Sequence, residues 1–213
     1  MAGSAAFIHN TALYRFVNVI YITSTKRWLN ISNYLKTKGI HPVYWICRDR
    51  HDMPRKISEE FPNVDIQTRF EAAQGIFPEE VDFHDDFPYI LDEMLLDRFT
   101  DLESTVLKMM DRLDPNGIGG IHFTYNERVR LYHRMLAYYL RILETHNPRA
   151  LICEDVPHEI GQYVLYSVMK KLGKYVLIVK RTPFNSGFVI ENQETNRYKL
   201  YLAINSKKSL KKV

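Results

Sequence analysis

Residues 16–47 read FVNVIYITSTKRWLNISNYLKTKGIHPVYWIC, and this stretch decides the fold. Residues 16–22 are mostly β-branched and aromatic, which is typical of a buried strand. Polar residues 23–25 predict a turn, and apolar residues at helical spacing then predict a helix that stops at Gly39. A second apolar run, 43–47, predicts another strand. Strand, helix and strand within about 30 residues form a βαβ unit, whose two strands are parallel.

The rest of the chain continues this alternation of strands and helices. The apolar periodicity predicts helices at 51–61, 89–113, 127–146 and 158–172. It predicts strands at 64–66, 150–153 and 175–179, and either edge strands or a descending segment at 188–190 and 198–202. Residues 69–88, which contain glycine, prolines and acidic clusters, are expected to form an extended connection. We therefore predict an α/β fold, a three-layer Rossmann-like domain with a mostly parallel sheet.

The length and the charge distribution limit the organisation and the partners. A chain of 213 residues can form one large domain or two small ones. We expect a flexible segment at 1–14, a Rossmann-like domain over 15–205, and a lysine-rich tail or the start of an interdomain linker at 206–213. The net charge of +4 comes from four lysines in this tail, because the remaining acidic and basic residues balance. A balanced body argues against a nucleic-acid partner.

The cysteines and the apolar runs indicate a compartment. Cys47 and Cys153 are far apart, and each lies in an apolar run, so buried reduced thiols are expected rather than a disulfide. The apolar stretches are shorter than the ~20 residues that a membrane span needs. The first seven residues lack the features of a signal peptide. We expect a cytoplasmic protein, with peripheral membrane association through the lysine tail as an additional option.

Polar residues follow each predicted strand at its carboxyl end. In an open parallel sheet, ligands bind at these ends, near the point where the strand order reverses. Charge at strand ends also arises from ordinary solvation, so position alone does not identify a site. The substrate-binding candidates are Thr23, Lys26, Arg48, Glu159, Arg181 and Asn185.

Residues 154–159 hold three carboxylates and an imidazole immediately before a predicted helix. An imidazole can accept or donate a proton near neutral pH, so His158, Glu154 and Asp155 are the catalytic candidates. Helix capping is a compatible alternative, in which Asp155 caps the helix, Pro157 occupies its first turn and Glu159 complements the helix dipole. Capping leaves His158 without a role.

Several motifs with known chemistry are absent from the sequence. It contains no HExxH, no GxGxxG after the first strand, no GxxxxGK[ST] and no GxSxG. Asp85 and Asp86 are adjacent and do not form a spaced DxD pair. We therefore expect no metal and no cofactor. The helix at 127–146 combines tyrosines with arginines, a pattern that fits a sugar or nucleic-acid surface but also half-buried tyrosines beside solvated arginines.

A family resemblance rests on residues 157–188. PHE at 157–159, YVLY at 163–166, KKLG at 170–173 and RTPFNSGF at 181–188 resemble a pattern in capsule and surface-polysaccharide biosynthesis proteins. That family is similar to GT-B glycosyltransferases, in which two Rossmann-like domains face each other across a cleft. The resemblance implies that this chain is the amino-terminal domain, which holds the acceptor glycan. A carboxyl-terminal domain beyond these residues would bind the nucleotide-sugar donor.

The leading hypothesis is therefore the acceptor-side domain of a polysaccharide glycosyltransferase. In it, His158 deprotonates the acceptor, and Lys26, Arg48 and Arg181 contact anionic sugar or phosphate groups. One alternative is a complete single-domain α/β enzyme that acts on a nucleotide or a phosphorylated sugar. Another is a non-catalytic glycan-binding or scaffold domain.

Overall fold

The computed structural model describes residues 16–48, 52–78, 93–113, 123–181, 187–192, 197–202 and 211–212. Its sheet has eight strands in the order β3-β2-β1-β4-β5-β6-β7-β8. The parallel strands are β1 (Val17–Ile22), β2 (Ile40–Cys47), β3 (Asp65–Thr68), β4 (Ala150–Cys153) and β5 (Tyr175–Arg181). The antiparallel strands are β6 (Gly187–Asn192), β7 (Arg197–Leu202) and β8 (Lys211–Lys212).

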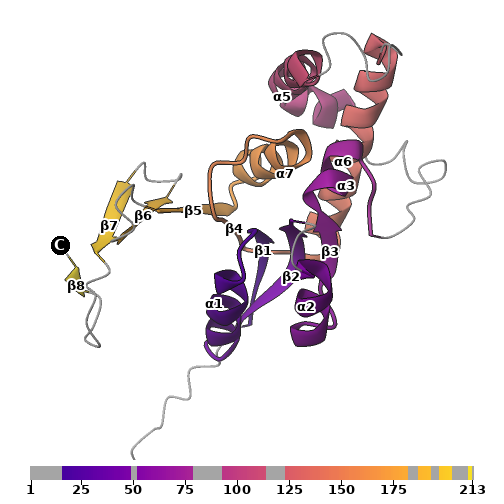
Figure 1. Cartoon of the computed structure of the whole chain (residues 1–213). Coiled ribbons are helices and arrows are strands. Elements are labelled where there is room, and N and C mark those ends of the chain that lie inside the picture. The colour runs from indigo at the N-terminus through magenta and orange to yellow at the C-terminus, as the bar shows by residue number, and fades with distance from the viewer. Residues whose placement is uncertain are drawn as a thin grey trace, which may run out of the picture.

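The strand order reverses between β1 and β4. From β1 the chain builds outward through β2 to β3, and then crosses back to add β4 and β5 on the other side of β1. Figure 1 shows this arrangement, with β5 leading into the antiparallel strands at one edge of the sheet. The carboxyl ends of β1 and β4 therefore flank the reversal, which is where such sheets bind ligands.

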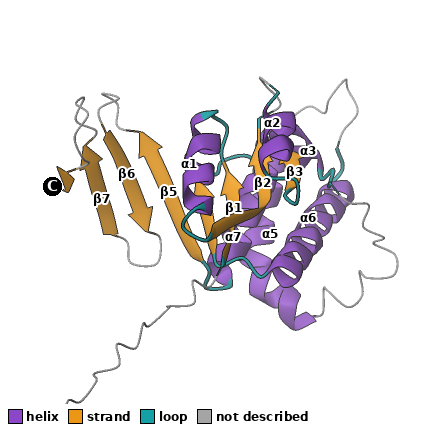
Figure 2. Ribbon diagram, turned by 90° about the horizontal axis from the view of Figure 1, so that it is seen from below, coloured by secondary structure: helices purple, strands orange, loops and turns teal. Residues whose placement is uncertain are grey.

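Helices cover both faces of the parallel strands. One face carries α1 (Arg27–Lys36) and α2 (Met53–Glu60), which lie in front of the sheet in Figure 2. The other face carries α3 (Arg69–Gln74), α5 (Glu93–Leu113), α6 (Tyr125–His146) and α7 (Ile160–Lys171). This arrangement confirms the prediction of a three-layer Rossmann-like α/β fold with a mostly parallel sheet.

Alternating strand side chains create two separate cores. Ile20 and Ile22 of β1 pack with α5, α6 and α7, whereas Val19 and Tyr21 pack with α1 and α2. Successive residues of a strand point to opposite faces, so a strand covered on both sides must be apolar throughout. This requirement explains the continuous apolar runs in the sequence.

Two helices begin with a capping box. In α3 the Thr68 hydroxyl accepts from the Glu71 N–H, and the Glu71 carboxylate accepts from the Thr68 N–H. Thr124 and Glu127 do the same at the start of α6. The prediction of an extended connection over 69–88 is therefore wrong for its first six residues. A six-residue helix is too short to produce a recognisable apolar period.

The tyrosines of α6 belong to the core. Tyr132, Tyr138 and Tyr139 are each at most 1% exposed. The sequence pattern therefore reflects burial, more complete than the half-burial expected, and not a sugar or nucleic-acid surface. Cys47 and Cys153 are both buried, and they form no disulfide with each other, as predicted. Burial also raises the pKa of the Cys153 thiol well above its ordinary value.

Among the described helices, none combines the length and apolar character required to cross a bilayer. The predicted flexible segment at 1–14 lies outside the described residues. The last strand, β8, pairs with β7 inside the segment that was predicted to be a tail.

Candidate functional site

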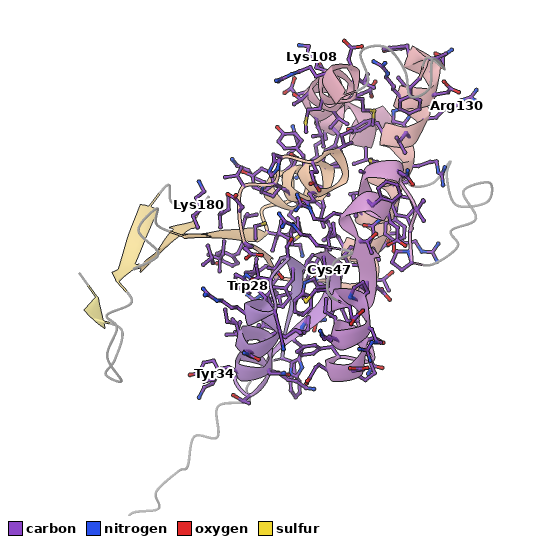
Figure 3. All side chains as sticks on the ribbon, in the orientation of Figure 1. Trp28, Tyr34, Cys47, Lys108, Arg130 and Lys180 are labelled. Atoms are coloured by element: carbon purple, nitrogen blue, oxygen red, sulfur yellow. The ribbon has the colours of Figure 1, made fainter. Side chains whose placement is uncertain are left out.

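A polar pocket of about 410 Å³ opens at the carboxyl edge of the parallel strands. In the sheet register Ile22 lies opposite Ile46 and Cys153, so β1, β2 and β4 end level with one another. The residues that follow these strands therefore meet at one edge, beside the reversal of strand order. The polar lining consists of Ser24, Thr25, Arg48, Arg69, Glu154, Asp155, His158, Gln162 and Lys180. Figure 3 shows Lys180 on the β5 side of this edge.

Glu154 joins the loops that follow β1 and β4. Its N–H donates to the Ile22 carbonyl at 2.9 Å, and its Oε2 accepts from the Ser24 N–H at 2.6 Å. The first turn of α1 contains no acidic residue. The Glu154 carboxylate binds the backbone at Ser24, three residues before α1 begins at Arg27, and so adds a negative charge near the N-terminus of that helix. It therefore holds the pocket together at the reversal point.

His158 is oriented by its own backbone. Its Nδ1 lies 3.0 Å from the Val156 carbonyl oxygen. Because a carbonyl only accepts, Nδ1 must carry the proton, and in the neutral ring Nε2 is then the unprotonated nitrogen. The ring is exposed at the pocket. His158 can therefore accept a proton from a ligand at Nε2.

Asp155 has a different role from the expected helix cap. Its Oδ1 accepts from the N–H of the next residue, Val156, at 2.7 Å. The N-cap of α7 is Glu159, and no side chain caps this helix. The capping interpretation of Asp155 is therefore wrong, and its exposed carboxylate lines the pocket together with His158.

Glu159 forms an ion pair with Arg69. Arg69 Nε donates to Glu159 Oε2 at 2.7 Å, and Arg69 Nη2 donates to Oε1. The pair is partly buried, with side-chain exposures of 17% for Arg69 and 34% for Glu159. Both residues also line a second hollow, together with Phe70, Ala73 and Ile160. Glu159 therefore links α3 to the start of α7 and does not line the polar pocket.

The structure brings four of the predicted residues into the pocket. They are the candidates Arg48, Glu154, Asp155 and His158. Thr23 is 1% exposed, and its hydroxyl accepts from Trp45 Nε1 at 2.9 Å, so it is a core residue. Lys26 is exposed at the N-cap of α1 and is outside the lining. Asn185 and the side chain of Arg181 lie outside the described residues.

Sequence reasoning missed two pocket residues that belong to helices. Arg69 is the first residue of α3, a helix that the sequence did not predict. Gln162 is the third residue of α7, four positions after His158. The predicted helix over 158–172 would have placed the two side chains on one face, but α7 begins at Ile160, so His158 precedes the helix and the spacing was no reliable signal. Ser24, Thr25 and Lys180 were recognisable as strand-end residues but were not selected.

Among the described residues, the charges at the pocket balance once Arg69 is counted with its ion-pair partner Glu159, which lies outside the lining. Arg48, Arg69 and Lys180 contribute three cations, and Glu154 and Asp155 contribute two carboxylates. The third carboxylate is Glu159, which is paired with Arg69. Within the described ranges, no three His, Cys, Asp or Glu side chains are grouped to hold a metal ion. A balanced polar pocket of this kind suits a neutral polar ligand better than a polyanion.

Comparison with known proteins adds no family assignment. No protein-family model matches the chain, and no curated protein matches it. The ligand of the pocket has to be inferred from the side chains that line it.

Proposed function

We propose that this chain is the acceptor-side domain of a glycosyltransferase that builds capsule or surface polysaccharide. The observation that carries the proposal is His158, an imidazole with Nδ1 committed to a backbone carbonyl, in a charge-balanced polar pocket at the strand reversal. The sequence resemblance over 157–188 supports the same assignment. The nucleotide-sugar donor is bound by a second domain outside these residues, and the transfer takes place in the cytoplasm, which two buried cysteines without a disulfide between them support.

The proposed reaction uses His158 as a general base. An acceptor hydroxyl gives its proton to His158 Nε2 while its oxygen forms a bond to the anomeric carbon of the donor sugar. The bond from that carbon to the donor phosphate breaks, and the nucleoside diphosphate leaves with the electron pair. Arg48 and Lys180, at the same edge, are the cations best situated to stabilise the departing phosphate.

A second candidate is a complete enzyme acting on a nucleotide or a phosphorylated sugar. Arg48 and Lys180 in the pocket lining favour it. Glu154 argues against it, because its carboxylate already accepts from the Ser24 N–H before α1. In Rossmann-like domains a phosphate commonly occupies that helix N-terminus. An anion there would meet the carboxylate of Glu154.

The substitution that tests the proposed function is His158→Ala in the enzyme that contains this domain. Removing a general base costs about 10²–10⁴ in rate, so we expect kcat to fall by that factor while acceptor binding is retained. A steady-state transfer assay with nucleotide-sugar donors measures both quantities. His133→Gln is the matched control, because His133 contacts Glu103 between α5 and α6 and is not part of the pocket lining. Turnover of His158→Ala equal to that of the control would refute the role.

A further inference from the structure

Two polar side chains in the pocket lining make no hydrogen bond within the described part of the chain. Gln162 is 4% exposed as a residue, but its amide is not among the fully buried polar atoms; it lines the pocket and makes no hydrogen bond with any described residue. The Thr25 hydroxyl is buried and has no partner in the described part of the chain. Buried polar groups in proteins are nearly always hydrogen-bonded, so the Thr25 hydroxyl requires an explanation, and the Gln162 amide in the same lining has its hydrogen-bonding capacity available to a ligand.

Gln67 provides the internal comparison. It is 0% exposed, and its Oε1 accepts from the hydroxyls of Tyr44 at 2.7 Å and Tyr139 at 3.2 Å. Its Nε2 donates to the Ile76 carbonyl at 2.5 Å. Both the oxygen and the nitrogen of this amide are hydrogen-bonded within the fold. Gln162 is almost equally buried but has none of these bonds, so its amide contributes nothing to the fold that an apolar side chain could not.

The hydrogen-bonding groups of Gln162 and Thr25 indicate which kind of ligand group can bind to both. A glutamine amide offers N–H donors and a carbonyl acceptor, and a threonine hydroxyl both donates and accepts. A ligand hydroxyl also donates and accepts, so it can satisfy both side chains. A phosphate oxygen only accepts and would leave the Gln162 carbonyl unpaired. The balanced charge of the pocket agrees with a neutral ligand.

We propose that Gln162 and Thr25 bind a hydroxyl group of the acceptor sugar and thereby select the sugar. This inference rests on the proposed function and deepens it, because it assigns the substrate class as a neutral sugar with a hydroxyl in this position. The recognised hydroxyl is distinct from the one that reacts at His158. A site built to bind a hydroxyl rejects analogues that lack it, since its own buried groups are then left unpaired.

The first part of the experiment measures stability with two matched substitutions, Gln162→Met and Gln67→Met. Each replaces the amide of a buried glutamine with an apolar side chain of similar size. Thermal unfolding of the ligand-free chain should show a lower Tm for Gln67→Met, because the substitution removes the partner of two buried tyrosine hydroxyls and of the Ile76 carbonyl. The Tm of Gln162→Met should equal or exceed that of the parent. A fall in Tm as large as that of Gln67→Met would overturn the inference, because it would mean that the Gln162 amide serves the fold.

The second part measures binding, with glucose, galactose, mannose and N-acetylglucosamine as probes. Each sugar is titrated into the parent and into Gln162→Met by ligand-observed NMR, with inorganic phosphate titrated in parallel. We expect the parent to bind at least one sugar and Gln162→Met to bind it about tenfold more weakly or worse. Thr25→Val removes the other group that is proposed to bind the hydroxyl, and it should weaken the binding of the same sugar.

The outcomes separate the inference from the function on which it rests. Unchanged sugar affinity in Gln162→Met overturns the inference and leaves the proposed function standing. Binding of phosphate but of no sugar overturns both, as does the absence of binding to every probe. Loss of turnover in His158→Ala concerns the proposed function alone, because that substitution leaves Gln162 and Thr25 in place.

Discussion

At the carboxyl edge of the parallel strands, the hydrogen-bond partner of a polar side chain determines whether that side chain is available to a ligand. Thr23 and Ser24 are adjacent, yet the Thr23 hydroxyl accepts from Trp45 in the core while Ser24 lines the pocket. Glu159 resembles Glu154 in sequence position, but Arg69 holds it outside the pocket. His158, Thr25 and Gln162 line the pocket and have hydrogen-bonding capacity that no described residue uses. Which side chains at this edge can bind a ligand therefore depends on residues from distant segments of the chain, such as Trp45 and Arg69.

Glu154→Ala tests the connection between the loops that follow β1 and β4. The substitution leaves the Ser24 N–H without its acceptor and removes the charge that complements the N-terminus of α1. We expect the free energy of unfolding to fall by about 1–3 kcal/mol, which urea denaturation measures. Glu144→Ala on the exposed surface of α6 is the control, and it should change stability by less than about 0.5 kcal/mol. Equal effects of the two substitutions would show that the hydrogen bond from the Ser24 N–H to Glu154 does not stabilise the fold.

The contact between α3 and α7 positions the two pocket residues that come from helices, Arg69 and Gln162. Gly161, the second residue of α7, lies so close to α3 that an added Cβ would be 2.2 Å from the Ala72 carbonyl oxygen. This approach brings Arg69 to Glu159 and leaves Gln162 lining the pocket. Glycine is required here by close packing, because its φ is not in the left-handed region.

Gly161→Ala should therefore destabilise the protein. In an open helix the same change stabilises by about 0.5–1 kcal/mol, because alanine loses less conformational entropy than glycine. Here the backbone of α3 must move, and we expect a loss of about 1–3 kcal/mol in the free energy of unfolding. Urea denaturation gives the sign directly. An increase in stability would mean that α3 and α7 are not in close contact.

The order of elements in the whole chain was predictable, but their arrangement was only partly so. The apolar runs of β1, β2 and β4 identify buried parallel strands, because such strands are covered on both faces. The crossing from β3 to β4 spans more than 80 residues, between Thr68 and Ala150. No local sequence pattern in this connection predicts on which side of the growing sheet β4 is added. The reversal between β1 and β4 is a property of this long connection.

The candidate site was predictable to the same extent. Arg48, Glu154, Asp155 and His158 follow strands directly, and the rule for open parallel sheets identifies them. Arg69 and Gln162 reach the pocket from helices, so their positions depend on how α3 and α7 pack against each other. Packing between helices is a tertiary property that composition and periodicity do not encode locally.

The central claim is that the pocket at the strand reversal binds a neutral sugar. Backbone amide chemical-shift mapping of the chain during titration with glucose, galactose, mannose and N-acetylglucosamine tests it most directly. We predict that the shifted amides lie in residues 23–25, 154–158 and 160–163, around the pocket formed after β1 and β4 and at the start of α7. Shifts confined to any other part of the chain, or none with any of the four sugars, would contradict the claim.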